Sequence, residues 1–155
     1  TYDRGSRRGS QISRDGMMRA DGEWRSIILR NLISNATKFT ENGFIRIYSK
    51  QNSHYQIIVE DNGKGMSDKQ LARINKLINK QPLIEEDEQI DNKEGFGLGY
   101  IIISELVQIL EGKINVESKT GEGTKVTISL PLAYQWLICL TTTPFHCILS
   151  VVTHR

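Results

Sequence analysis

The sequence predicts an α+β fold in which helices cover one face of a mostly antiparallel sheet. Helical and strand-like segments follow one another in the order helix, strand pair, helix, loop, helix, strand pair. The strand-like segments come in close pairs, as in hairpins, and glycines separate the segments. The chain has 155 residues, of which 38% are hydrophobic and 25% charged, so it can bury a core without disulfides.

The first half of the pattern is a helix followed by a hairpin. Apolar residues recur at positions 24, 28, 32, 36 and 39, which predicts a helix from Trp24 to Phe39 that stops before Gly43. Residues 44–50 and 55–60 alternate in polarity like two paired strands, with a turn at 51–54 between them.

The second half repeats this order with two helices. Ser67 is predicted to cap a helix that extends to about Lys80 and has an apolar side. Residues 81–94 are predicted to form an acidic loop. The remaining elements are a helix over 98–111 that Gly112 closes and a hairpin formed by 113–118 and 124–130; the apolar side of the Ser67 helix carries Leu71, Ile74, Leu77 and Ile78.

Composition divides the chain into three zones. Residues 1–16 are rich in Gly, Ser and Arg and are predicted to be a flexible basic leader. Residues 17–131 form the predicted domain. Residues 132–155 form a tail whose members up to 154 include no Lys, Arg, Asp or Glu. A poor membrane helix, an extra packed element and a non-native extension all remain open for this tail.

Charge and cysteine content exclude several classes of function. The net charge is +2, from 20 Lys and Arg against 18 Asp and Glu, so nucleic acid is not an expected partner. The two cysteines, Cys139 and Cys147, are too few for a disulfide framework and lack the companions of a zinc site. A reducing compartment is therefore expected.

Polar residues lie next to the apolar stripe of the first helix. At about 100° per residue, Asn35 falls on the apolar face, with Asn31 and Lys38 beside it. One interpretation is a pair of core asparagines bonded to backbone. The other is a ligand site, because an amide oxygen can bind Mg²⁺ and a lysine can neutralise phosphate.

Two glycine-containing segments could also contact a ligand. Asp61 ends a strand and is followed by Gly63 and Gly65, so a ligand can approach the backbone, and the carboxylate can accept a hydrogen bond from an amine such as that of adenine. Gly95, Gly97 and Gly99 precede a helix, where free N–H groups attract phosphate. Each segment alone is compatible with a turn or a hinge, but these two segments and the asparagine-bearing helix, all in one chain and in this order, are hard to explain as turns.

In this order, the segments 31–39, 61–66, 95–99 and 121–124 closely resemble the boxes of the catalytic ATP-binding domain of sensor histidine kinases, over about Met17 to Pro131. That domain belongs to the GHKL (Bergerat) ATPase superfamily, shared with DNA gyrase and mismatch-repair ATPases. The resemblance implies a two-layer α/β sandwich with a mixed, mostly antiparallel sheet and ATP held beneath a lid at 67–94.

The resemblance also implies roles for individual residues. At the phosphate end, Asn35 would coordinate Mg²⁺, Asn31 would help to hold the metal and the phosphates, and Lys38 would face the phosphates. At the base end, Asp61 would bond the adenine amine, and Thr124 would lie nearby through water. The other implied ATP-binding residues are Phe39, Gly63, Gly65, Met66, Gly95, Phe96, Gly97, Leu98 and Gly99.

One substitution bears on the mechanism. Gyrase-like members have a glutamate that activates water four positions before the metal asparagine, whereas this chain has Asn31, which cannot act as a base. The site therefore suits transfer of the γ-phosphoryl of Mg-ATP to a histidine, with positioning and charge stabilisation as the means of catalysis. Asn31 and Lys38 are the predicted catalytic residues.

The chain departs from the family in two respects. The lid lacks the usual phenylalanine-centred box, so the residue that contacts the γ-phosphate is open among Arg73, Lys76 and Lys93. The phosphoacceptor histidine box, the dimerising helices and an upstream strand are absent. The expected protein is an excised catalytic module, inactive by itself, from the cytoplasmic part of a membrane-bound sensor kinase.

The expected partners are the dimerisation and phosphoacceptor domain of the same kinase and the receiver domain of a response regulator, with membrane contact only through missing parts. Two other functions remain open at this stage: an anti-sigma-type serine kinase and a nucleotide-responsive module that transfers nothing.

Overall fold

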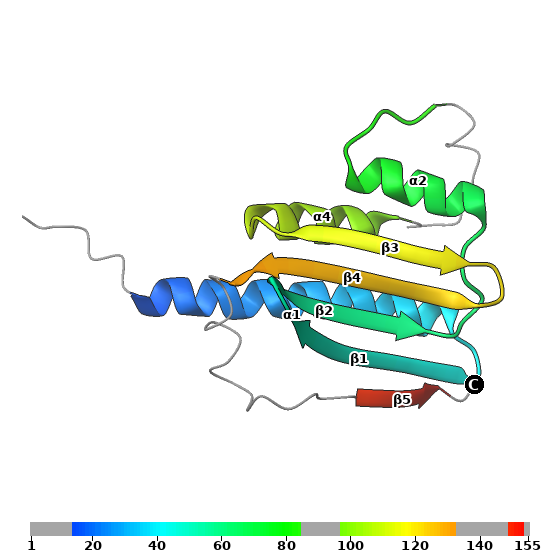
Figure 1. Ribbon diagram of the computed structural model, residues 1–155, viewed down its shortest axis with the longest axis horizontal. Helices are drawn as coiled ribbons and strands as arrows, with labels where there is room; N and C mark the ends of the chain where they lie inside the picture. Colours follow the sequence, from blue (N-terminus) through cyan, green and yellow to red (C-terminus); the bar gives the residue numbers. More distant parts are fainter. Residues whose placement is uncertain (1–13, 85–96, 133–148, 154–155) are drawn as a thin grey trace, which may run out of the picture.

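The computed structural model describes residues 14–84, 97–132 and 149–153, which form a five-stranded sheet covered by three helices (Figure 1). The helices are α1 (Arg14–Phe39), α2 (Asp68–Ile78) and α4 (Leu98–Ile109). The strands are β1 (Gly43–Gln51), β2 (His54–Asp61), β3 (Lys113–Lys119), β4 (Gly123–Pro131) and β5 (Leu149–Thr153). Their order across the sheet is β3-β4-β2-β1-β5.

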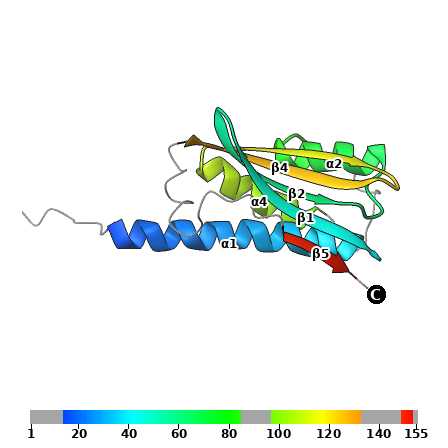
Figure 2. The same ribbon diagram turned by 60° about the horizontal axis from the view of Figure 1, so that its bottom comes forward.

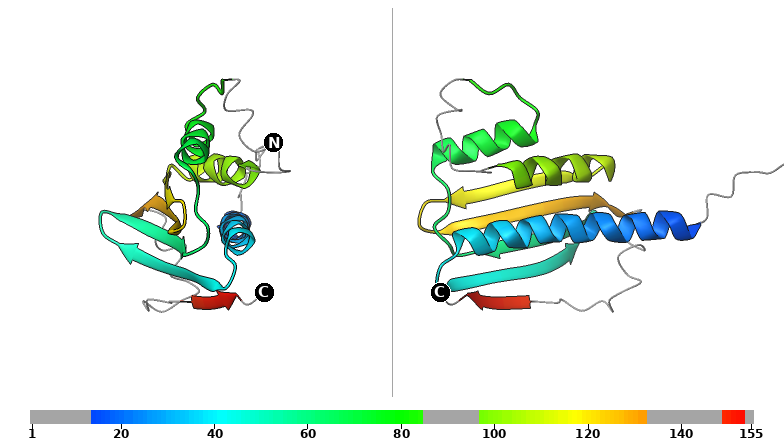
Figure 3. Two further views of the ribbon diagram at one scale, coloured as in Figure 1. Left: turned by 90° about the vertical axis from the view of Figure 1, so that its right-hand side faces the viewer. Right: turned by 180° about the vertical axis from the view of Figure 1, so that it is seen from behind.

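All three helices lie on one face of the sheet, as the end-on view in Figure 3 shows. The predicted α+β class and two-layer arrangement are therefore confirmed. The expectation of a mixed sheet is wrong for the part of the chain that the structure describes, where all four strand pairings are antiparallel. The β1–β2 and β3–β4 pairs are tight hairpins, which only antiparallel strands can form.

The core lies between the two layers. Helix α1 contributes Ile28, Leu32 and Ala36, each spaced by four residues, so the predicted apolar stripe is the buried face. The sheet contributes inward-facing residues from four strands: Ile45, Val59, Val116, Val126, Ile128 and Leu130. Ile103 and Val107 of α4 and Ile74 of α2 complete the core.

Helix α2 has the predicted start. The Ser67 side chain accepts a hydrogen bond from the backbone N–H of Gln70, and the Gln70 side chain accepts one from the backbone N–H of Ser67. This reciprocal pair fixes the first turn, and α2 packs on α4 and β3. The helix is part of the segment predicted to be the lid.

Helix α1 begins at Arg14 and not at Trp24, so it includes the last residues of the predicted leader. Its first turns extend beyond the end of the sheet (Figures 1 and 3). An apolar stripe arises only where a helix packs, so hydrophobic periodicity could not detect these turns.

The tail contributes a strand to the sheet. β5 pairs antiparallel with β1, from Gly43 opposite Thr153 to Ile47 opposite Leu149, and Figure 2 shows it along that edge. Of the three alternatives for the tail, an extra packed element applies to residues 149–153. No helix within 14–84 or 97–132 is long and apolar enough to cross a membrane.

Candidate functional site

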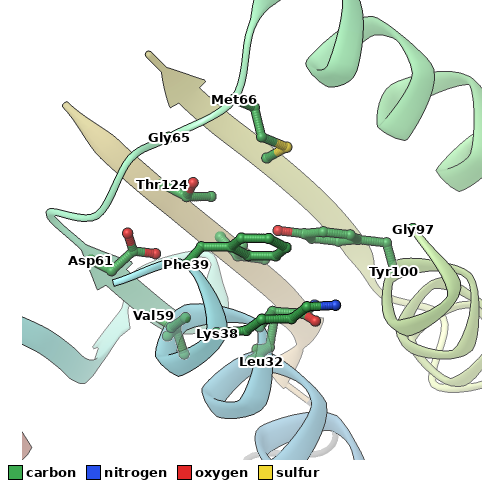
Figure 4. A pocket seen from close by; sticks show the side chains of 13 residues that line it. Leu32, Lys38, Phe39, Val59, Asp61, Gly65, Met66, Gly97, Tyr100 and Thr124 are labelled. Atoms are coloured by element: carbon green, nitrogen blue, oxygen red, sulfur yellow. The ribbon is translucent and has the colours of Figure 1, made fainter. Parts of the chain in front are cut away.

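A pocket opens between the C-terminal end of α1, the strands β2 and β4, and the first turn of α4 (Figure 4). Its free volume is about 30 Å³. The residues that line it are Leu32, Asn35, Ala36, Lys38, Phe39, Val59, Asp61, Gly65, Met66, Gly97, Tyr100, Thr124 and Val126. Four segments that are separate in the sequence thus meet in one place.

Asp61 lies at the end of β2, on one side of the pocket (Figure 4). Its side chain is 7% exposed, and its Oδ1 accepts a hydrogen bond of 2.8 Å from the backbone N–H of Gly63. Burial raises the pKa of this carboxyl, while hydrogen bonds from Gly63, Thr40 and Thr124 oppose the shift. A carboxylate held in this way can accept a hydrogen bond from a ligand that enters the pocket.

The glycines after Asp61 are required by close backbone contacts. Gly65 has a φ of 65°, and a Cβ there would collide with the carbonyl group of Lys119. A Cβ at Gly63 would collide with the carbonyl oxygen of Phe39. The segment therefore passes close to both the end of α1 and the β3–β4 hairpin, which positions Met66 at the pocket.

A small hydroxyl network holds the β3–β4 hairpin against this segment. Ser118 Oγ lies 2.9 Å from Thr124 Oγ1 and donates to the carbonyl of Gly123 at 2.8 Å. The same oxygen accepts a hydrogen bond of 2.9 Å from the backbone N–H of Met66. Thr124 pairs with Asp61 across β4 and β2, so the hydroxyl of Thr124 lies beside the carboxylate end of the pocket.

Asn31 and Asn35 face the first turn of α4. A Cβ at Gly99 would lie 3.1 Å from Asn35 Nδ2 and 3.6 Å from Asn31 Oδ1, so only a glycine leaves this space open. Asn31 Nδ2 donates to the carbonyl of Ile27 at 2.8 Å, which directs its Oδ1 toward α4. Asn35 Nδ2 is buried and has no hydrogen-bond partner among the described residues.

The N-terminus of α4 supplies free N–H groups at the same end. Gly97 is the N-cap in the left-handed region, with a φ of 93°, and no described side chain caps this helix. The first intrahelical bond joins Ile101 N–H to the Gly97 carbonyl, so the N–H groups before it have no partner within the helix. Arg73 of α2 lies alongside, because a Cβ at Gly97 would be 3.5 Å from its Nη1.

Two lysines lie near the aromatic ring of Phe39, the last residue of α1. The Nζ of Lys38 lies 5.5 Å from the ring centroid of Phe39, and that of Lys64 lies 4.9 Å from it. Both lysines are exposed. They add positive charge at the edge of the pocket.

Most of the site residues predicted from the sequence lie at or beside this pocket. Leu98 is 57% exposed at the start of α4 and does not line it. Gly95, Phe96 and Lys93 are outside the described residues. Tyr100 was not predicted to be a site residue, because an aromatic side chain fits the apolar pattern of α4. Its place directly after Gly99 is the feature of the sequence that could have indicated it.

The donors at the Asn31–Asn35 end fit a magnesium ion that is shared with phosphates. Magnesium prefers oxygen ligands and usually takes only one or two from the protein. The amide oxygens that could serve as ligands face the open space at Gly99, because a Cβ built there would lie 3.2 Å from Asn35 Oδ1 and 3.6 Å from Asn31 Oδ1. The buried Asn35 Nδ2, which has no partner among the described residues, is a donor and suits a phosphate oxygen instead. The described ranges contain no group of three or more His, Cys, Asp or Glu side chains that could hold a metal ion.

The profile of the family described as histidine kinase-, DNA gyrase B- and HSP90-like ATPases matches residues 20–134. The chain belongs to this family. Its curated relatives include sensor kinases, and the solved structure of ShkA has a similar fold.

The autoinducer 2 sensor kinase/phosphatase LuxQ of Vibrio parahaemolyticus is 33% identical over 113 residues, which cover 68% of this chain and 13% of LuxQ. The sensor histidine kinase RcsC of Escherichia coli K12 is 33% identical over 107 residues, 68% of this chain and 11% of RcsC. The structure of full-length ShkA in complex with AMPPNP has a TM-score of 0.54 at 27% identity and covers 70% of this chain and 21% of that one. The chain thus corresponds to a small part of each relative.

Proposed function

We propose that this domain binds Mg-ATP and transfers its γ-phosphoryl group to a histidine on a separate phosphoacceptor domain. The observation that carries the proposal is that the two sides of the pocket differ in chemistry. A buried carboxylate, Asp61, lies at one side, and the two asparagines facing the glycine-capped N-terminus of α4 lie at the other. One side suits an amine-bearing base and the other suits phosphates with a metal.

At the base end, Asp61 accepts the hydrogen bond of the adenine amine. Gly63 N–H and Thr124 orient the carboxylate, and Met66 and Val59 supply apolar walls. At the phosphate end, Asn35 and Asn31 offer amide oxygens to magnesium and phosphates, and the free N–H groups of α4 meet the phosphate charge. Magnesium, when bound, neutralises phosphate charge.

Within the described part of α1, Asn31 stands where gyrase-like members carry the glutamate that activates water. The amide of Asn31 has no useful basicity and is held by its bond to the Ile27 carbonyl. Its carbonyl oxygen can orient phosphates but cannot take a proton from water. Catalysis then consists of positioning the phosphates, with Lys38 and Arg73 as the cations that compensate developing charge.

The proposed partners are a helical dimerisation and phosphoacceptor domain and, downstream, a receiver domain of a response regulator. The similarity to LuxQ and RcsC supports this proposal, since both are named as sensor kinases. The proposed location is the cytoplasmic portion of a membrane-bound sensor.

A transfer assay tests the proposal. The chain is incubated with γ-labelled ATP, Mg²⁺ and a helical phosphoacceptor domain, with an Asp61→Asn chain as the control. Acid-labile, base-stable label on the acceptor is the expected result. Acid-stable label would indicate a serine kinase, and nucleotide binding without any transfer would indicate a nucleotide-responsive module; either outcome contradicts the proposed reaction.

A further inference from the structure

Tyr100 is the one large side chain on α4 that points into the pocket from the side opposite Asp61. In Figure 4 its ring and the ring of Phe39 point toward one another across the centre of the pocket. Tyr100 belongs to the first turn of α4 and Phe39 to the last turn of α1. Both rings line the pocket.

The remaining space is too small for a nucleotide base. The free volume of about 30 Å³ is room for one or two waters, whereas ligand pockets typically have about 300–1,000 Å³. The walls are correspondingly inaccessible: Tyr100 is 5%, Asp61 7% and Met66 7% exposed. The carboxylate that would recognise adenine is therefore covered in this conformation.

We propose that the Tyr100 ring fills the base site in this conformation, and that it must leave this position before adenine can enter. Tyr100 thereby sets the nucleotide affinity of this domain. The inference rests on the proposed function, because it takes the Asp61 side of the pocket to be the base site.

The surroundings of Tyr100 allow the ring to be displaced. Gly97, three residues earlier, is in the left-handed region, and Gly99 has no side chain between α4 and α1. A small shift of this first turn, or a rotation of the side chain, would carry the ring away from Phe39. The helix beyond this turn is anchored by Ile103 and Val107, which are 0% and 1% exposed, so the movement is confined to its N-terminal end.

A ring that must be displaced weakens binding in a predictable way. The apparent dissociation constant is the intrinsic constant divided by the fraction of molecules with an open site. If the ring fills the site in about 90% of molecules, its removal tightens binding about tenfold. The gain applies equally to any ligand that needs the base site, with or without phosphates.

The test compares four variants by titration with adenosine and with Mg-ADP. Tyr100→Leu and Tyr100→Met remove the ring and keep residues that favour helices. Tyr100→Phe keeps the ring and removes the hydroxyl. Ile102→Leu is the matched control on the same helix, because Ile102 is 38% exposed and does not line the pocket. Circular dichroism and thermal unfolding verify that each variant is folded.

We expect Tyr100→Leu and Tyr100→Met to bind both ligands about tenfold more tightly than the unsubstituted chain. Tyr100→Phe and Ile102→Leu should bind as the unsubstituted chain does. Equal or weaker adenosine binding by the Leu and Met variants would overturn the proposal, as would a gain for Mg-ADP alone, since the ring would then act on the phosphates.

The titrations distinguish a failure of the role of Tyr100 from a failure of nucleotide binding. If the unsubstituted chain binds Mg-ADP and the Leu and Met variants gain nothing, the role of Tyr100 is refuted while nucleotide binding stands. If neither the unsubstituted chain nor any variant binds adenosine or Mg-ADP, the proposed function is wrong and the role of Tyr100 is overturned with it.

Discussion

Replacement of Asp61 by asparagine changes the base end of the pocket by one functional group. The amide oxygen can keep the hydrogen bond that Oδ1 now accepts from the Gly63 N–H at 2.8 Å. The second oxygen becomes an NH₂ group, which meets the adenine amine donor to donor. The variant thus preserves the shape of the site and removes its charged acceptor.

The magnitude follows from the burial of Asp61. Its side chain is 7% exposed, so water cannot replace the lost partner easily. A hydrogen bond to a charged group that is left poorly satisfied costs about 1–3 kcal/mol. At about 1.4 kcal/mol for each factor of ten, the affinity for Mg-ADP should fall roughly 5- to 150-fold.

Isothermal titration calorimetry with Mg-ADP measures this loss directly. Glu60→Gln is the matched control, because it removes the same charge one residue earlier on β2, from a side chain that does not line the pocket. We expect that control to bind within twofold of the unsubstituted chain. Unchanged affinity in Asp61→Asn, or an equal loss in Glu60→Gln, would refute the assignment of Asp61 to the base.

Four further outcomes are expected. Burial raises the pKa of Asp61 above its value in the unfolded chain. The contribution of this carboxyl to the free energy of unfolding therefore falls as the pH rises from the unfolded pKa through the folded pKa. Asp61→Asn should remove this pH dependence in thermal unfolding and should be no less stable than the unsubstituted chain at pH 7. Gly65→Ala should lower the free energy of unfolding in urea by about 3 kcal/mol, because its φ is positive and its Cβ would collide with Lys119. Gly121→Ala is the control and should cost about 1 kcal/mol, because its φ is 80° but no atom lies within 4 Å of the added Cβ. The isolated chain should acquire no label from γ-labelled ATP, and stoichiometric acid-labile label on His54 would contradict an external acceptor. Mg-ATP should slow amide exchange at 98–100, and identical exchange with and without nucleotide would exclude this turn as the phosphate site.

The helices that pack against the sheet were predictable because a helix with one buried face has apolar residues at helical spacing in its sequence. Ile28, Leu32 and Ala36 were expected on one face of α1 and are buried there. The turns of the same helix before Trp24 were not predicted, since they extend past the sheet and carry no apolar stripe. The antiparallel pairing of both hairpins followed from their short turns.

The tail shows a different limit. Leu149–Thr153 is rich in β-branched residues, but nothing in its pattern indicates that its partner is the β1 edge more than 100 residues earlier. Pairing of that kind depends on which edge the rest of the fold leaves open. The sequence therefore allowed an extra packed element without identifying where it would pack.

The sequence could indicate the glycines and asparagines at the pocket, because such residues are unusual where they stand. It could not indicate a side chain that matters only because its ring occupies part of the pocket. Asn31 and Asn35 were conspicuous because polar groups are costly beside an apolar stripe. Tyr100 was not, because an aromatic residue in a helix of Ile, Leu and Val fits a core position equally well. Only the arrangement of α1 against α4 shows that its ring reaches the pocket.

The central claim, a pocket with a base end at Asp61 and a metal–phosphate end at Asn35, is tested most directly by ligand binding with and without Mg²⁺. Adenosine and ADP are titrated into the unsubstituted chain, Asn35→Ala, and Asn115→Ala, an exposed asparagine on β3 that serves as the control. We expect Mg²⁺ to tighten ADP binding in the unsubstituted chain and in the control but not in Asn35→Ala. All three should bind adenosine equally and independently of Mg²⁺. ADP binding that ignores Mg²⁺ in the unsubstituted chain, or an equal loss of adenosine and ADP binding in Asn35→Ala, would contradict it.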